Sequence, residues 1–68
     1  MEVNPVRLRQ LREARGLSLR DLEWLSGVRY NTIWRIEAGR RKRTHRSTVQ
    51  KLAHALGVEP TELMKGLS

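Results

Sequence analysis

Apolar residues recur every three or four positions along most of this chain, which is the spacing that lines one face of an α-helix. The clearest run follows positions i, i+3, i+4 and i+7 and consists of Val49, Leu52, Ala53 and Leu56. It predicts a helix that opens at Ser47 and Thr48, covers a core and ends at Gly57. The residue that precedes this helix is Thr44 or Arg46.

Proline predicts the first position of two further helices, because its missing N–H leaves nothing unpaired there. Near the N-terminus, Asn4 caps a helix that starts at Pro5 and ends at Gly16. Near the C-terminus, Pro60 opens a short last helix whose apolar residues are Leu63, Met64 and Leu67.

The middle of the chain predicts two short helices joined by a tight turn at Gly27, since glycine tolerates a positive φ angle. The first helix, 19–26, begins with a capping box made by Ser18 and Asp21. One face of this helix is expected to carry Leu22, Leu25 and Ser26.

The second of these helices, 30–38, ends before Gly39 and is expected to turn Ile33 and Ile36 inward. Val28 and Ile33 occupy the positions of a hydrophobic staple, which fixes the angle at which the helix leaves the turn. Two helices set at an angle by a short turn that contains glycine form a helix-turn-helix, a motif of nucleic-acid readers.

A set of spaced residues extends this pattern to the end of the chain: Leu22, Ser26-Gly27-Val28, Thr32-Ile33, Arg35-Ile36-Glu37, Gly39, Leu56-Gly57-Val58, Pro60, Glu62 and Leu63. In these residues the chain resembles the phage repressor and Cro-type helix-turn-helix family (the XRE-type domain). The resemblance covers nearly all 68 residues. It implies an all-α, compact bundle of about five short helices, a single domain over 1–68 with the helix-turn-helix at 18–38. It also implies binding to operator DNA, often as a dimer.

The formal net charge is +7, and most of the excess lies in residues 29–46, where seven basic side chains face one carboxylate, Glu37. A charge run alone is typical of a solvated face, but beside a helix-turn-helix it favours a loop that binds the phosphate backbone. Such contacts position a protein without specifying a sequence. They are expected from Arg12, Arg29, Thr32, Arg40, Arg41, Lys42, Arg43 and Arg46.

Four residues of helix 30–38 are candidates for reading bases. Asn31 and Arg35 point away from the two inward isoleucines, and these residue types make bidentate bonds to adenine and guanine, respectively. Tyr30 and Trp34 offer flat apolar surface for thymine methyl groups or sugars. The resemblance independently implies base contacts at Tyr30, Asn31 and Arg35. The alternative for each residue is an ordinary solvated side chain.

Arg12 falls within the apolar stripe of the first helix, and Glu37 falls beside the inward face of helix 30–38. Unpaired buried charges are costly, so the simplest prediction is that Arg12 and Glu37 pair. Arg15 is a competing partner for Glu37, and Arg12 lifting its head to water is the alternative. The resemblance also implies a salt bridge between the two positions, from which spare donors of Arg12 would reach phosphate.

The chain departs from the family pattern at three places. Leu19 stands where a glutamine commonly contacts phosphate, and Arg29 stands where a serine or threonine commonly caps the second helix of the motif. Glu23 replaces a small alanine and is expected either to tilt outward or to loosen the helix contact. Trp24 faces outward near Arg20 and is expected to be partly packed by neighbouring long side chains.

Several classes of function are not expected. The absence of cysteine excludes a disulfide framework and a thiolate metal site and fits a reducing cytoplasm. The spacing of His45 and His54 predicts no metal site. No apolar run approaches the roughly 20 residues of a bilayer span, and no signal-peptide segment is present, so no membrane partner is expected. Paired carboxylates and glycine-rich phosphate loops are missing too, so neither an enzyme nor a cofactor is expected.

The sequence therefore predicts a cytoplasmic transcriptional regulator, most simply a repressor, that binds double-stranded DNA in the major groove. Two copies are expected on a near-palindromic operator. The resemblance implies a homodimer contact at the C-terminal end, with candidates Val58, Pro60, Thr61 and Leu63, of which Val58 and Leu63 are expected rather to close the core. The alternative function is a protein-interaction module or the antitoxin of a toxin–antitoxin pair, with Trp24, Trp34 and the last helix as its contact surface.

Overall fold

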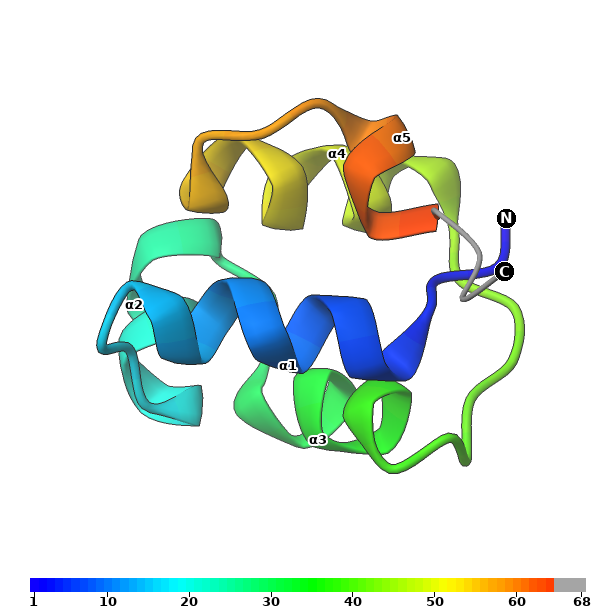
Figure 1. Cartoon of the computed structure of the whole chain (residues 1–68). Coiled ribbons are helices and arrows are strands. Elements are labelled where there is room, and N and C mark those ends of the chain that lie inside the picture. Colours follow the sequence, from blue (N-terminus) through cyan, green and yellow to red (C-terminus); the bar gives the residue numbers. More distant parts are fainter. Residues whose placement is uncertain (65–68) are drawn as a thin grey trace.

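Five α-helices form the architecture of the computed structural model, which describes residues 1–64 (Figure 1). They are α1 (Pro5–Ala14), α2 (Leu19–Ser26), α3 (Tyr30–Glu37), α4 (Arg46–Leu56) and α5 (Pro60–Met64). The predicted all-α bundle of short helices is therefore confirmed. Leu67, which was assigned to the last helix from the sequence, lies outside the described residues.

Local side-chain signals set the helix ends. The side chain of Asn4 accepts hydrogen bonds from two backbone N–H groups in the first turn of α1. Ser18 and Asp21 make both bonds of the predicted capping box, at 3.0 and 2.8 Å, and Gly27 ends α2 with a φ of 79°. The end of α3 and the start of α4 each fall one residue from the prediction, which is within ordinary fraying of helix ends.

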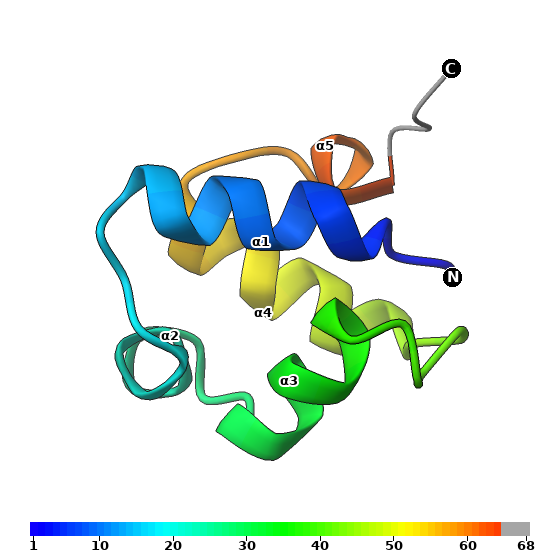
Figure 2. The same cartoon turned by 60° about the horizontal axis from the view of Figure 1, so that its bottom comes forward.

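The helices enclose one apolar core. α1 packs against α3 and α5, α2 packs against α3 and α4, and α4 packs against α5. The largest fully buried side chains are Leu8, Leu22, Ile33, Ile36, Val49, Leu52, Leu56 and Leu63. The predicted stripe of α4 is entirely buried. Figure 2 shows α3 at one edge of the bundle, so that one side of this helix faces the core and the other side faces outward.

One prediction about the core is wrong. Leu22 is fully buried, but Leu25 is 57% exposed and does not share its inward face. Successive helical residues are separated by about 100°, so the buried strip of α2 runs between Leu22 and the half-buried Leu19 and Ser26. Leu25 lies on the other side of Leu22, beyond the edge of this strip.

The first residues of the chain run beside the loop that follows α3. The carbonyl oxygen of Met1 accepts a hydrogen bond of 2.8 Å from the N–H of Thr44, and Glu2 forms an isolated antiparallel bridge with Arg43. Val3 is buried in the core. The N-terminal segment therefore ties this loop to the body of the bundle.

The capping box predicts an acid-sensitive contribution to stability. Hydrogen bonds from the backbone and side chain of Ser18 lower the pKa of Asp21. The ionised carboxylate therefore stabilises the fold above its unfolded pKa of about 4, and this contribution is lost as pH falls through the folded pKa. We expect Asp21→Asn to melt below the parent at pH about 7 and the gap to narrow toward pH about 3, in thermal melts across that range. A gap that stays constant with pH would contradict this role.

Candidate nucleic-acid interface

The orientation of α3 is fixed by its buried side. Ile33 and Ile36 have no exposed surface, and Val28, which precedes the helix, belongs to the same core. Asn31 and Arg35 lie on the opposite side and are exposed. The structure therefore turns the two polar candidates for base contact away from the core, as the helical spacing predicted.

Two aromatic rings lie beside this outer side, and an arginine guanidinium lies over each ring. Tyr30 and Trp34 are 40% and 45% exposed. The Cζ atom of Arg20 lies 4.0 Å from the centroid of the Tyr30 ring, and that of Arg40 lies 5.4 Å from the Trp34 ring. Both distances fall within the range of cation–π attraction. Sequence reasoning did not select Arg20, because its partner lies on another helix and no local pattern links the two.

Arg12 and Glu37 form a two-point ion pair between α1 and the end of α3. Nε and Nη2 of Arg12 lie 2.7 and 2.9 Å from the two carboxylate oxygens of Glu37, and Nη1 donates to the carbonyl oxygen of Leu17 at 2.7 Å. The hydrogen bond to Glu37 raises the pKa of Arg12 above its ordinary value, while burial acts in the opposite direction. The competing candidate Arg15 donates instead to the carbonyl oxygen of Leu11 in its own helix.

The same contacts bury most of the Arg12 side chain. The side chains of Arg12 and Glu37 are only 11% and 8% exposed, so Arg12 does not lift its head to water. Each guanidinium nitrogen of Arg12 has one protein acceptor, which occupies three of the five N–H donors of an arginine. These bonds hold α1 against α3, and the phosphate contact expected from the spare donors of Arg12 stays a prediction.

The start of α3 is capped from the neighbouring helix. Arg29, the residue before α3, makes no side-chain capping bond. Instead, Oε2 of Glu23 in α2 accepts a hydrogen bond of 3.1 Å from the backbone N–H of Tyr30. Oε1 of Glu23 also lies 3.7 Å from Nη1 of Arg20. Glu23 therefore joins α2 to α3, whereas the sequence predicted that it would tilt outward or loosen their contact.

The basic loop, residues 40–46, follows α3 and carries most of the excess charge; its last residue, Arg46, is also the first residue of α4. Its cations are exposed except for the half-buried Arg41, whose Nε donates to the carbonyl oxygen of Arg43 at 3.3 Å. The ion pairs found within residues 1–64 involve none of these cations. Of the other candidate phosphate contacts, Arg29 is exposed and Thr32 is half-buried. The positive charge of this loop is thus available to an anionic partner.

Trp24 on α2 is not packed as predicted. It is 84% exposed and lies next to the exposed Leu25. Arg20, the neighbour expected to cover it, stacks on Tyr30 instead. Leu19, at the position where the family commonly has a glutamine, packs against the core. The outer surface of α2 therefore presents an uncovered apolar pair.

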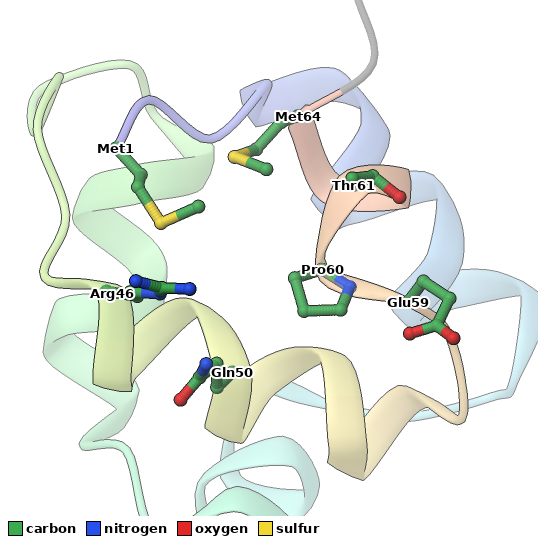
Figure 3. A pocket seen from close by; sticks show the side chains of 7 residues that line it. All are labelled: Met1, Arg46, Gln50, Glu59, Pro60, Thr61 and Met64. Carbon is green, nitrogen blue, oxygen red and sulfur yellow. The ribbon is translucent and has the colours of Figure 1, made fainter.

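The candidate dimer residues divide into two groups. Leu63 is fully buried and Val58 packs against the core, as expected for residues that close it. Pro60 and the exposed Thr61 line a hollow of about 370 Å³ between α4, α5 and the N-terminus, as Figure 3 shows. Its other lining residues are Met1, Arg46, Gln50, Glu59 and Met64. Pro60 and Thr61 thus remain accessible to a second molecule, whereas Leu63 does not.

Other classes of site find no support in the described residues. His45 and His54 are both exposed. Residues 1–64 contain no cluster of three or more side chains suited to hold a metal ion. None of the helices in this range is both long enough and apolar enough to cross a membrane.

The chain matches a family model described as "Helix-turn-helix domain" over residues 6–65. It is 45% identical over 53 residues to proteins of Mycobacterium tuberculosis and Mycobacterium bovis described as HTH-type transcriptional regulators. That match covers 78% of this chain and 20% of the relatives, so the chain spans about one fifth of their length.

Solved structures give the same fold. The restriction-modification controller protein C.AhdI of Aeromonas hydrophila is 42% identical, with a TM-score of 0.81 that covers 87% of this chain and 88% of that one. A domain of hydroxyethylphosphonate dioxygenase is 24% identical, with a TM-score of 0.80, and covers all of this chain and 14% of that one. At that identity the second likeness concerns the fold alone.

The buried ion pair predicts a larger loss of stability on mutation than an exposed ion pair does. Glu37→Gln leaves the Arg12 charge buried without a counter-charge, so we expect a loss of about 3 kcal/mol in the free energy of unfolding. Glu13→Gln, which removes the carboxylate from the exposed pair with Arg9, should cost less than about 1 kcal/mol. Urea denaturation of both variants measures the difference. A Glu37→Gln protein as stable as the Glu13→Gln control would show that the pair is dispensable.

Proposed function

The chain belongs to the helix-turn-helix domain family, and on that premise we propose that it reads double-stranded DNA by sequence and regulates transcription. In this proposal α3 enters the major groove, and the domain acts as a repressor, as the resemblance to phage repressors implies. The observation that carries it is the exposed pair Asn31 and Arg35, directly opposite the buried Ile33 and Ile36. The residue types match adenine and guanine edges, respectively.

The distribution of charge supports the same proposal. Beside α3 lies the basic loop, whose cations have no carboxylate partner in the described part of the chain. Arg29, Arg40, Lys42, Arg43 and Arg46 are exposed and suited to phosphate. Contacts of this kind release counterions, so binding should weaken steeply as salt is added, with a slope of about 0.9 per phosphate neutralised. We expect a specific Kd of about 10⁻⁸ to 10⁻¹¹ M at physiological salt.

We further propose that two copies bind a near-palindromic operator, with their α3 helices about 34 Å apart. The accessible surface at Pro60 and Thr61, beside the hollow of Figure 3, is the contact proposed between the copies. This surface lies on α5, whereas the proposed DNA-reading residues lie on α3. The contact would therefore leave both reading helices free.

A second candidate function rests on one observation, the exposed pair Trp24 and Leu25 on α2. Such a pair suits a protein-interaction module or an antitoxin, and Trp34 would extend the surface. An antitoxin can also bind DNA, so the two functions overlap. Titration with random duplex at two salt concentrations separates them: a DNA reader shows a steep salt slope, whereas a pure interaction module binds weakly with a shallow one.

Substitutions on α3 should act on specificity. We expect Arg35→Ala and Asn31→Ala each to lose about 1–3 kcal/mol in binding to an operator selected from a random pool, with little change on random duplex. Lys42→Ala should weaken both complexes alike and lower the salt slope by about one. Fluorescence anisotropy on the two duplexes measures these effects. Undiminished discrimination in Arg35→Ala would exclude the proposed reading face.

The proposed dimer contact has its own test. Thr61→Arg brings like charges together across a two-fold axis. The preference for the full operator, expressed as its affinity divided by that for a single half-site, should therefore fall toward one. Gln10→Arg adds the same charge on exposed α1 and should leave this preference intact. Comparing the two variants by anisotropy cancels the general effect of added positive charge. Equal preferences in both variants would place the contact elsewhere.

A further inference from the structure

Glu23, Arg20 and Tyr30 form a cluster where α2 meets the start of α3. Glu23 accepts a hydrogen bond from the backbone N–H of Tyr30 at 3.1 Å and lies 3.7 Å from Arg20. Arg20 in turn places its guanidinium 4.0 Å from the centroid of the Tyr30 ring. Glu23 therefore contacts the backbone of Tyr30, and Arg20 links the Glu23 carboxylate to the Tyr30 ring. Figure 2 shows α2 beside the first turn of α3, where this cluster lies.

The cluster places a negative charge where it opposes the proposed DNA contact. A carboxylate near the first turn of α3 is attracted by the positive end of the helix dipole, but it repels the phosphate groups of DNA. A serine or threonine at position 29 would cap the helix without that repulsion. Capping alone therefore does not account for Glu23, whereas its second contact, to Arg20, places a cation over the ring.

Tyr30 is held in a defined position by these contacts. Its backbone is fixed by Glu23 and one face of its ring is covered by Arg20, yet the residue is still 40% exposed. Residues at the N-terminal end of a recognition helix reach base edges in the major groove. The one apolar group that bases present there is the methyl group of thymine. A ring fixed before binding loses little freedom on contact.

We propose that Glu23 and Arg20 are positioning residues that hold the Tyr30 ring for contact with a thymine methyl group, which makes the cluster a determinant of sequence preference. This inference rests on the proposed function and deepens it. Neither Glu23 nor Arg20 touches the base in this arrangement. Their effect on DNA reading passes through the ring of Tyr30.

The test replaces thymines by deoxyuracil, one at a time, in an operator selected from a random pool. For the parent protein, each half-site should contain one thymine whose replacement by deoxyuracil lowers the affinity for the operator about fourfold. Tyr30→Ala should abolish that loss. Glu23→Ala and Arg20→Gln should each reduce it to less than about twofold. Binding of Glu23→Ala to random duplex should be unchanged or stronger, because a negative charge has been removed.

Two controls separate positioning from stability and from charge. Glu13→Ala removes a carboxylate from exposed α1 and should keep the fourfold methyl effect. The double variant Arg29→Ser with Glu23→Ala supplies a local cap to α3. It should recover the melting temperature without recovering the methyl effect.

The outcomes separate this inference from the proposed function. A full methyl effect in Glu23→Ala, or its return in the double variant, would reduce Glu23 to a helix cap and overturn the inference. The inference would also be overturned if Tyr30→Ala changed the effect of removing the methyl group at no thymine of the operator. In each of these cases specific binding through Asn31 and Arg35 survives. Absence of any sequence preference in the parent protein would instead overturn the proposed function, and the inference with it.

Discussion

The buried ion pair between Arg12 and Glu37 fastens the end of α3 to α1. Ile33 and Ile36 turn one side of α3 toward the core, and the pair adds a directional contact to these apolar ones. The pair joins two nitrogens to two oxygens at 2.7 and 2.9 Å, an arrangement that a planar guanidinium allows in few orientations. A buried pair adds little net stability compared with apolar residues of equal volume. Its geometry agrees with the rotation that the buried isoleucines give α3, in which Asn31 and Arg35 face outward.

What the sequence predicted well is local. Caps such as Ser18 and glycine stops such as Gly27 act within one turn, and helical spacing alone identified the buried and exposed sides of α3 and α4. The pair of Arg12 with Glu37 was also predictable, because each was a charge on an apolar face. The role of Glu23 was not, since it caps a helix that begins seven residues later. Its outcome depends on the angle between α2 and α3, which no periodicity encodes.

The fold by itself does not determine what this domain does. Nearly the same arrangement of helices forms a small part of a dioxygenase and almost the whole of a restriction-modification controller protein. Function therefore depends on the residues placed on the scaffold. In the proposed function those are polar and aromatic groups on the exposed side of α3 and a basic loop whose cations form no ion pair within residues 1–64. The exposed Trp24 and Leu25 lie on α2, outside this set, which is why a role in protein contact is argued separately.

The pairing of residues 1–3 with the basic loop restrains that loop before any partner binds. A free loop loses about 1–2 kcal/mol of backbone entropy for every residue that binding immobilises. The backbone bond between Met1 and Thr44 and the bridge between Glu2 and Arg43 restrain part of this loop before any partner arrives. Loss of the contacts of residues 1–3 would release the loop and restore its backbone entropy. Under the proposed function, changes in these residues would therefore alter the affinity for DNA even if the side chains proposed to contact DNA stay the same.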